Sequence, residues 1–282
     1  MAKGPGTVLA LPDGIARHWG LAELRDPVPL EGGYHNLLLR CDDLVLRIEK
    51  RHPESVAWEH ELLAWLSAEI GEIVTPVPAD DGSTFLAFDD RVATVLPFVD
   101  GAPRAGIAVA ELLARIHTRG AAWPHARARP GRPAYSELDW ERNDWWDWSV
   151  VPKPPELVRG FERARAWIES GPELAVTPIH GDPAQQNVLW RDGRIVAVLD
   201  WEWARMDWPA LELANAAWTF AEDDVDTFVA AYCAAGGPGE PEALDEGMRI
   251  FVLANALYTL TRDPSGNGDW ITFLLDRLRQ AT

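Results

Sequence analysis

The chain contains few cysteines, few basic residues and no long apolar run. Its only cysteines are Cys41 and Cys233, too few for a disulfide framework. No apolar stretch is long enough to cross a bilayer, and the first residues lack the apolar core of a signal peptide. These absences argue against a disulfide-rich secreted domain and a membrane-spanning protein, so we expect a cytoplasmic protein without a membrane partner.

Basic residues are outnumbered, with 26 Lys and Arg against 44 Asp and Glu, for a formal net charge of −18. An acidic surface repels nucleic acid and raises the local concentration of cations. We therefore expect a small cationic partner and no nucleic acid, although the acidity also fits a role in solubility alone. No obligatory protein partner is evident.

The most informative stretch, residues 180–187, reads His-Gly-Asp-Pro-Ala-Gln-Gln-Asn, and Asp200 follows thirteen residues after Asn187. Asp192-Gly193 lies between two apolar runs and predicts a two-residue hairpin turn. In that register Asn187 faces Val198. Asp200 then lies diagonally across from Asn187 on the same face, with Cα atoms roughly 7 to 8 Å apart.

These spacings predict a centre for phosphate chemistry. An amide oxygen and a carboxylate that converge, as Asn187 and Asp200 would, suit a hard cation such as Mg²⁺. Asp182 lies five residues before Asn187 in a loop, where a carboxylate can orient a hydroxyl group and accept its proton. A chance His-Gly-Asp in a turn is the alternative, but the ordered set favours a catalytic role for Asp182 and metal-ligand roles for Asn187 and Asp200.

Residues 180–190 and 198–204 resemble the catalytic loop and the metal-binding segment of the aminoglycoside phosphotransferase and choline kinase family, which shares the protein kinase fold. The resemblance implies an α+β, two-lobe fold, with a small antiparallel sheet and one main helix followed by a mostly helical lobe. We expect a nucleotide-binding lobe at residues 1–97 and a catalytic and substrate-binding lobe at residues 98–282. The implied cofactors are ATP, or GTP, and Mg²⁺.

The resemblance also assigns nucleotide contacts in the first lobe. Gly32 and Gly33 would expose backbone amides to the phosphates. Arg47, on an alternating strand at residues 44–48, takes the place of the lysine that binds phosphate in kinases of this fold. Residues 54–67 predict an amphipathic helix, on which Glu59 is preferred to Glu61 as the partner of Arg47.

The β-rich run at residues 92–96 and the residues after it resemble the hinge of the same family, and the resemblance implies that this segment binds the adenine base. Pro97 offers a backbone carbonyl and Val99 a backbone amide, while Leu96 would line the back of the purine pocket.

Acceptor contacts are sought in the second lobe. The apolar residues of segment 121–155 have no regular spacing, which predicts a long loop. Long loops in compact domains are often functional. The fifteen tryptophans are mostly expected in the core, although an indole face can bind a cation. The candidate contacts to a cationic substrate are the polar residues Asp139, Glu141, Asn143, Asp144, Glu202, Asp207 and Glu212. Glu202 and Glu212 have an alternative role in orienting the catalytic loop.

The remaining second lobe predicts helices at residues 106–117, 154–170, 208–221, 223–235, 242–262 and 268–279. His180 is expected to brace the catalytic loop, and His117 to pack or support it. Together these features predict an ATP-dependent phosphotransferase acting on a hydroxyl of a small cationic molecule. An antibiotic, either an aminoglycoside or a basic cyclic peptide such as a tuberactinomycin, is the first candidate. A metabolite kinase for choline, an amino alcohol or a sugar is the alternative. A pseudokinase that only binds nucleotide is disfavoured, because none of the core polar positions that catalysis requires is vacant in this chain.

Overall fold

The computed structural model describes residues 14–20, 27–30, 36–221, 224–238, 240, 243–266 and 268–280. The chain divides into two compact units, and each is treated separately below. The first comprises the described residues up to Ala64 together with Val74–Asp100, and the second comprises Trp65–Ile73 and the residues from Gly101 onward. The functional division at residue 97 stays a prediction.

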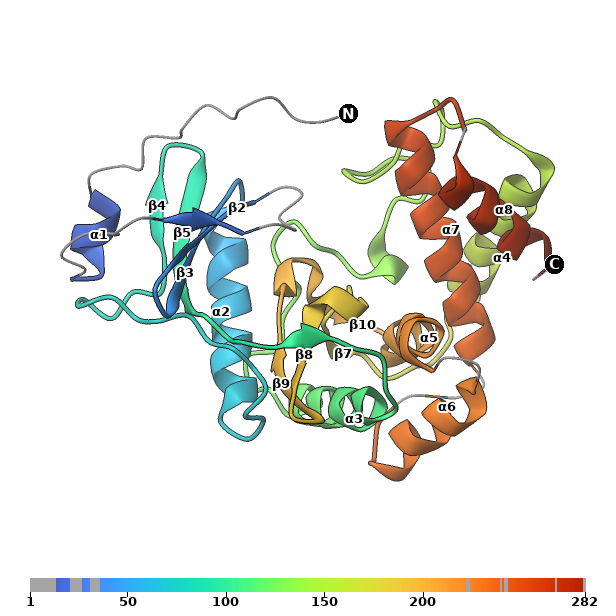
Figure 1. Cartoon of the computed structure of the whole chain (residues 1–282). Helices are drawn as coiled ribbons and strands as arrows, with labels where there is room; N and C mark the ends of the chain where they lie inside the picture. The colour runs from blue at the N-terminus through green and yellow to red at the C-terminus, as the bar shows by residue number, and fades with distance from the viewer. Residues whose placement is uncertain are drawn as a thin grey trace. The chain divides into compact units, whose positions relative to one another are not determined.

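The first unit is built on a five-stranded antiparallel sheet (Figure 1). Its strands lie in the order β1 (Val28–Pro29), β2 (Leu37–Cys41), β3 (Leu44–Glu49), β5 (Arg91–Pro97) and β4 (Leu86–Phe88). The helices of this part of the chain are α1 (Gly14–His18) and α2 (Pro53–Ser67). The expected small antiparallel sheet with one main helix is confirmed.

The two faces of β3 pack against different surroundings. Leu46 and Ile48 lie in a core cluster with residues of β2 and β5. Arg47 and Glu49, on the opposite face, are also buried. A charged side chain can be buried at this position because Glu59 of α2 pairs with Arg47.

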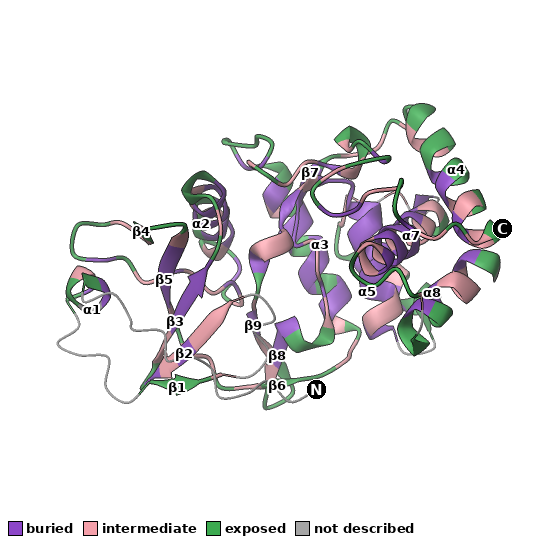
Figure 2. Ribbon diagram, turned by 90° about the horizontal axis from the view of Figure 1, so that it is seen from above, coloured by how far each residue is buried: buried purple, intermediate pink, exposed green. Residues whose placement is uncertain are grey.

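The second unit is mostly helical, as expected. Its helices are α3 (Ala108–Ala121), α4 (Pro155–Glu169), α5 (Pro209–Phe220), α6 (Val225–Ala234), α7 (Leu244–Arg262) and α8 (Asp269–Gln280). α5 and α7 pack side by side (Figure 1). α5 is buried along nearly its whole length (Figure 2), which explains its apolar composition. No helix among the described residues is long and apolar enough to cross a membrane.

The long loop at residues 121–155 forms part of the core of the second unit. Its only helical turn is η1 (Tyr135–Glu137). Trp140, Trp145 and Trp146 are buried in a cluster with Leu253 of α7. Burial of aromatic rings of this size contributes strongly to stability, so packing accounts for most of the tryptophans in this loop.

Short strands in the second unit position the predicted catalytic segment. β8 (Val188–Arg191) pairs with β6 (Ala102–Pro103) and with β9 (Arg194–Val198). β7 (Thr177–Ile179) pairs with β10 (Arg205–Asp207). The chain passes from β7 through residues 180–184 and the short helix η2 (Gln185–Asn187) into β8, so both ends of the segment are fixed by strands.

The β8–β9 hairpin has the expected turn but not the expected register. Asp192 and Gly193 have φ of 51° and 75°, as a two-residue hairpin turn requires. An irregularity between Leu189 and Trp190 shifts the pairing, so that Val188 and not Asn187 faces Val198. The predicted partner of Asn187 was therefore wrong, because a β-bulge moves every later side chain by one position.

Candidate active site

Asp182 and Asn187 are in direct contact within the segment between β7 and β8. The Asn187 Nδ2 donates hydrogen bonds to the backbone oxygen of Asp182, at 3.0 Å, and to its Oδ2, at 3.1 Å. The amide nitrogen of Asn187 is thus directed at Asp182. This leaves the Asn187 Oδ1 as the donor atom suited to a cation.

His180 connects this segment to the end of β9. Its Nδ1 accepts a hydrogen bond from the backbone N–H of Asp182 at 3.2 Å, and its Nε2 lies 2.8 Å from the backbone oxygen of Leu199. Because an acceptor Nδ1 requires the proton on Nε2, His180 is the neutral tautomer that donates to Leu199. The expected bracing role of His180 is confirmed by these contacts.

Asp200 follows immediately, in a backbone conformation that favours glycine. The backbone N–H of Leu199 donates to the backbone oxygen of Asn187 at 2.8 Å, which fixes the chain next to Asp200. Asp200 itself has φ 61° and ψ 64°. The left-handed conformation re-aims its exposed side chain, so the alternation expected for a regular strand does not apply there.

The donor atoms offered by this segment fit a hard cation. Asn187 and Asp200 provide oxygen ligands, and the exposure of Asp200 leaves room for the waters that Mg²⁺ retains. Within the part of the chain that the structure describes, no group of three or more His, Cys, Asp or Glu side chains could hold a metal on its own. Mg²⁺ at nucleotide sites usually takes phosphate oxygens and waters as its remaining ligands.

The buried carboxylate of Glu212, on α5, holds the beginning of the segment. It accepts backbone hydrogen bonds from His180 at 2.9 Å and Gly181 at 2.6 Å, and lies 2.7 Å from the Nε2 of His117. Burial alone would raise its pKa, but the hydrogen bonds with the His117 ring and with the backbone of His180 contribute to lowering it overall. The other ring nitrogen of His117 lies 2.7 Å from the hydroxyl of Tyr232 on α6.

Gly181 is required at its position for two reasons. It has φ 83°, and a Cβ there would collide with the backbone oxygen of Trp203. The close approach brings the segment after β9 directly against the Asp182 loop.

Burial raises the pKa of Asp182, and the negative charges of Glu212 and Glu202 add to this rise, while the hydrogen bond from Asn187 opposes it. A carboxylate with a raised pKa is a stronger proton acceptor when ionised.

A second buried charge network lies in the first unit. Arg47 of β3 contacts Glu59 of α2 at 2.9 Å and Glu49 at 3.2 Å. Arg51 contacts the same two carboxylates, at 2.7 and 2.9 Å. Glu59 is only 1% exposed, whereas Glu61 is exposed, so the Arg47 pairing is made by Glu59, the preferred candidate.

Comparison of the sequence with known protein families gives a match that covers most of the chain. Residues 26–246, well over half of the chain, match the model of the phosphotransferase enzyme family, abbreviated APH. The chain belongs to this family. Over 195 residues it is 28% identical to a homoserine kinase from Paraburkholderia phymatum, which covers 62% of this chain and 57% of that kinase. The match spans less than two thirds of the length of that kinase.

Solved structures show the same fold at low sequence identity. An amicoumacin kinase has a TM-score of 0.70 at 14% identity, over 90% of this chain and 86% of that one. A microcompartment-associated aminopropanol kinase has 0.68 at 19%, over 90% and 89%. A thermostable mutant of the aminoglycoside phosphotransferase APH(4)-Ia has a TM-score of 0.67 at 18% identity, over 94% of this chain and 96% of that one. The kinase-like two-lobe fold expected from the sequence is thereby confirmed.

Of the other nucleotide contacts expected from the family resemblance, the structure describes some residues and not others. Gly32 and Gly33 lie outside the described residues. Leu96 and Val99 are half-buried and Pro97, at the end of β5, is exposed. Their roles in binding adenine stay predictions.

The acidic candidates for acceptor binding fall into two groups. Asp207 is fully buried, and its Oδ2 accepts hydrogen bonds from Arg205 at 2.7 Å and from the backbone of Tyr135 at 3.2 Å. Glu212 is committed to the loop as described above. Both carboxylates therefore have structural partners, and we leave them out of the proposed acceptor contacts.

The candidates in the long loop lie nearer the surface. Asp139 accepts backbone hydrogen bonds from Glu141 and Arg142, and Asn143 accepts from Trp145 and Trp146, so both shape the loop. The side chain of Glu141 pairs with Arg165 at 2.9 Å on an exposed surface. Asp144 is exposed.

Arginines that hold the segment after β9 were missed by the sequence analysis. The buried Arg129 donates to the backbone oxygens of Trp201, at 2.9 Å, and Ala204, at 2.7 Å. Arg132 lies against Trp203 and Glu202. No spacing links residues seventy positions apart, so only the tertiary structure reveals these contacts.

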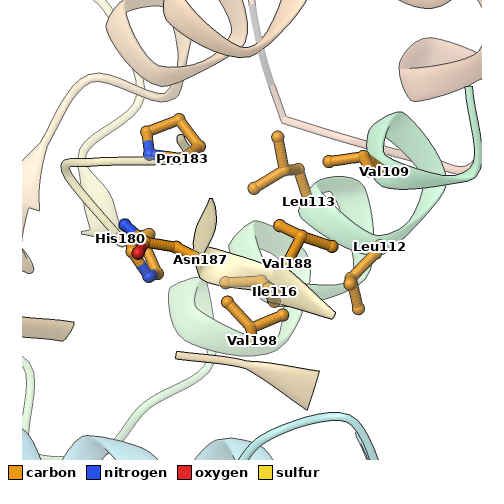
Figure 3. A pocket seen from close by; sticks show the side chains of 9 residues that line it. All are labelled: Val109, Leu112, Leu113, Ile116, His180, Pro183, Asn187, Val188 and Val198. Atoms are coloured by element: carbon orange, nitrogen blue, oxygen red, sulfur yellow. The ribbon is translucent and has the colours of Figure 1, made fainter. Parts of the chain in front are cut away.

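A small cavity lies behind the Asp182 loop, between α3 and the β8–β9 hairpin (Figure 3). It is lined mostly by apolar side chains, with His180 and Asn187 at one side. Its volume of about 10 Å³ is roughly that of one water molecule. The cavity is therefore too small to accept a substrate.

Proposed function

We propose that this chain transfers the γ-phosphoryl group of ATP to a hydroxyl group of a small, amine-bearing molecule. The observation that carries the proposal is the contact between Asp182 and Asn187 in a loop held by His180 and Glu212. Phosphoryl transfer needs positioning and charge neutralisation more than covalent chemistry, and this arrangement suits both.

Each polar group has a proposed role. Asp182 orients the acceptor hydroxyl and takes its proton, while Asn187 and Asp200 hold Mg²⁺, which neutralises charge on the phosphates when bound. Arg47, positioned by Glu59, contacts the nucleotide phosphates. Gly32 and Gly33 would add backbone contacts to the phosphates, with Leu96, Pro97 and Val99 holding the base. GTP is the alternative nucleotide.

For the acceptor, a cationic antibiotic is the first candidate. The net charge of −18 favours cations, and the amicoumacin kinase and the APH(4)-Ia enzyme are antibiotic kinases of the same fold. Phosphorylation would then inactivate the drug. Glu202, Asp139, Glu141, Asn143 and Asp144 remain the proposed polar contacts.

The second candidate is a metabolite kinase for a hydroxylated amine. The similarity to a homoserine kinase favours it, since that similarity lies in the sequence itself and not only in the fold. An amino alcohol acceptor is supported in the same way by the aminopropanol kinase neighbour.

Mass spectrometry of an acceptor panel tests the proposal. Aminoglycosides, a tuberactinomycin, choline, homoserine and 3-aminopropan-1-ol would each be incubated with the protein, ATP and Mg²⁺. We expect one acceptor to gain the mass of one phosphoryl group with matching ADP release, and Asp182→Ala to abolish both. A protein that binds nucleotide but phosphorylates nothing on a panel extended to other hydroxylated amines and sugars would contradict the proposal.

A further inference from the structure

Two residues at the end of β3 extend the Arg47–Glu59 pair of the first unit. Glu49, the last residue of β3, has its Oε1 3.2 Å from the Nη2 of Arg47. Arg51 follows two positions later and contacts Oε2 of Glu49 at 2.9 Å and Oε2 of Glu59 at 2.7 Å. Each carboxylate therefore has one oxygen on Arg47 and the other on Arg51. We refer to Arg47, Glu49, Arg51 and Glu59 as the four-charge cluster.

The four-charge cluster is buried, so its charges act on one another with little screening. All four side chains are 8% exposed or less. Water and salt screen such buried charges weakly. Burial lowers the pKa of Arg51, but the charges of Glu59 and Glu49 outweigh burial and raise that pKa overall. A change of one charge in the cluster therefore changes the electrostatic potential at its other members.

The two carboxylates place more negative charge beside Arg47 than one guanidinium group carries. The carboxylate of Glu59 matches the charge of Arg47, and Glu49 adds a second negative charge at 3.2 Å. Arg51 supplies the matching positive charge, since both of its nitrogens Nη1 and Nη2 are directed at these carboxylates.

The direction of two changes follows from these contacts alone. Removing the charge of Arg51 makes the surroundings of Arg47 more negative by one charge, whatever other groups lie near Arg47. Removing the charge of Glu49 makes those surroundings more positive by one charge. Negative surroundings oppose the binding of phosphate and positive surroundings favour it.

We propose that Arg51 is a positioning residue for nucleotide binding, which neutralises Glu49 so that the charge of Arg47 remains available to the phosphates. The inference rests on the proposed phosphotransferase function, in which Arg47 contacts those phosphates. Glu59 then sets the place of Arg47, while the balance between Glu49 and Arg51 sets how strongly Arg47 attracts phosphate.

The test compares ADP with adenosine, which has the same base and sugar and no phosphates. Their dissociation constants are measured by calorimetry on the full chain with Mg²⁺, and we expect the unaltered chain to bind ADP more tightly. Arg51→Met keeps a long side chain and removes the charge. It is expected to weaken ADP about tenfold, the order of effect of one charge a few ångströms away inside a protein, and to change adenosine by less than about twofold.

Glu49→Gln is expected to change the affinity for ADP in the opposite direction. It should tighten ADP about three- to tenfold, although it removes a buried ion-pair partner. The double variant with both substitutions removes one charge of each sign and should bind ADP within about twofold of the unaltered chain. A purely structural role predicts weaker binding in all three variants, because each loses buried ion pairs.

Lys50→Met is the matched control for the change in net charge. Lys50 lies between Glu49 and Arg51 in the sequence, and its side chain is 77% exposed. This variant loses one positive charge, as Arg51→Met does. It should change the affinity for ADP by less than about twofold, because water and salt screen an exposed charge.

Several outcomes separate the possibilities. If Glu49→Gln binds ADP no more tightly than the unaltered chain, the inference is overturned, even where Arg51→Met fails to fold. An equal loss for ADP and adenosine in Arg51→Met also overturns it and shows a structural role. Equal affinities of the unaltered chain for the two ligands contradict the proposed phosphate contact of Arg47 and overturn the inference with it.

Mass spectrometry of the acceptor panel tests the proposed function separately. Opposite changes in ADP affinity for Arg51→Met and Glu49→Gln, in a chain that phosphorylates no acceptor, contradict the function and leave the role of Arg51 in nucleotide binding in place.

Discussion

The two charge networks of this chain, one in each unit, are built in opposite ways. Arg47, Glu49, Arg51 and Glu59 are close to fully buried and form direct ion pairs with one another. Around Asp182 the ionic and hydrogen-bonding groups behind the loop are buried, while Asp182 is half-buried and Asp200 is exposed. The first network fixes the guanidinium groups of Arg47 and Arg51. The second fixes the backbone of the loop and leaves Asp200 exposed.

This difference predicts which positions matter for stability and which for catalysis. Removing a member of the closed network leaves a charge buried, and the cost falls on folding. Replacing the exposed carboxylate of Asp200 costs little stability, so its effect is expected on phosphoryl transfer. The predictions below separate the two.

The largest expected effect is that of Asp200→Asn on phosphoryl transfer. Loss of the carboxylate charge is expected to lower kcat with Mg²⁺ by about 100-fold or more, since a bound metal supplies several kcal/mol of charge stabilisation. Asp192→Asn is the matched control, because Asp192 also has a positive φ and asparagine tolerates that conformation. Steady-state kinetics of both variants measure the effect, and equal rates would remove Asp200 from the proposed metal site.

In the first unit, Glu59→Gln is expected to destabilise the fold. Arg47 and Arg51 would lose a shared buried counter-charge, at a cost of about 3 to 5 kcal/mol. The exposed Glu61 on the same helix is the control, and Glu61→Gln should change the free energy of unfolding by less than about 0.5 kcal/mol. Urea unfolding of the two variants measures both free energies of unfolding. Similar values would show that the Arg47–Glu59 pair does not contribute to stability.

Glu212 should make stability depend on acidic pH. Its pKa is lowered in the folded chain from 4.5, so its contribution to stability is present above about pH 4.5 and is lost as the pH falls through the lower, folded pKa. Glu212→Gln should remove this part of the pH dependence, whereas Arg142→Met should leave it. Thermal unfolding between pH 3 and pH 7 measures this dependence of stability on pH. Parallel plots of Tm against pH for Glu212→Gln and the unaltered chain would contradict the prediction.

The smallest effect is expected on the outer surface of the long loop. Glu141 and Arg165 form an exposed pair, and such pairs contribute about 0 to 1 kcal/mol. Glu141→Gln should therefore alter stability by less than about 1 kcal/mol, and a large rise in KM for the acceptor would instead show that Glu141 contacts substrate.

The sequence predicted the helices and the residues of the catalytic loop better than it predicted which residues pair with one another. The six helices of the second unit lie within a few residues of their expected bounds, because each has an apolar face of regular spacing. The contact between Asp182 and Asn187 follows from a separation of five residues in one turn. The pairing of Asn187 with Val198 failed because a single extra residue in β9 is invisible in the pattern of apolar residues.

Long-range partners were the least predictable. Arg51 joins the Arg47–Glu59 network just beyond the end of β3, and Arg129 and Arg132 reach the segment after β9 from a loop without periodicity. Such contacts depend on how the chain folds back on itself, which local propensity does not encode. Glu212 was assigned either to substrate or to the loop, and its hydrogen bonds to His180 and Gly181 assign it to the loop.

The most direct test of the central claim, that Asp182 acts on the acceptor in the catalytic loop of a small-molecule kinase, is a single-turnover measurement of phosphoryl transfer. The unaltered chain and Asp182→Asn would each be mixed with Mg²⁺, ATP and the acceptor found on the panel, with nucleotide affinity measured in parallel. We predict that Asp182→Asn binds nucleotide normally and transfers phosphate about 100- to 10,000-fold more slowly, the contribution of a positioned base. Equal rates in the two proteins would contradict the account.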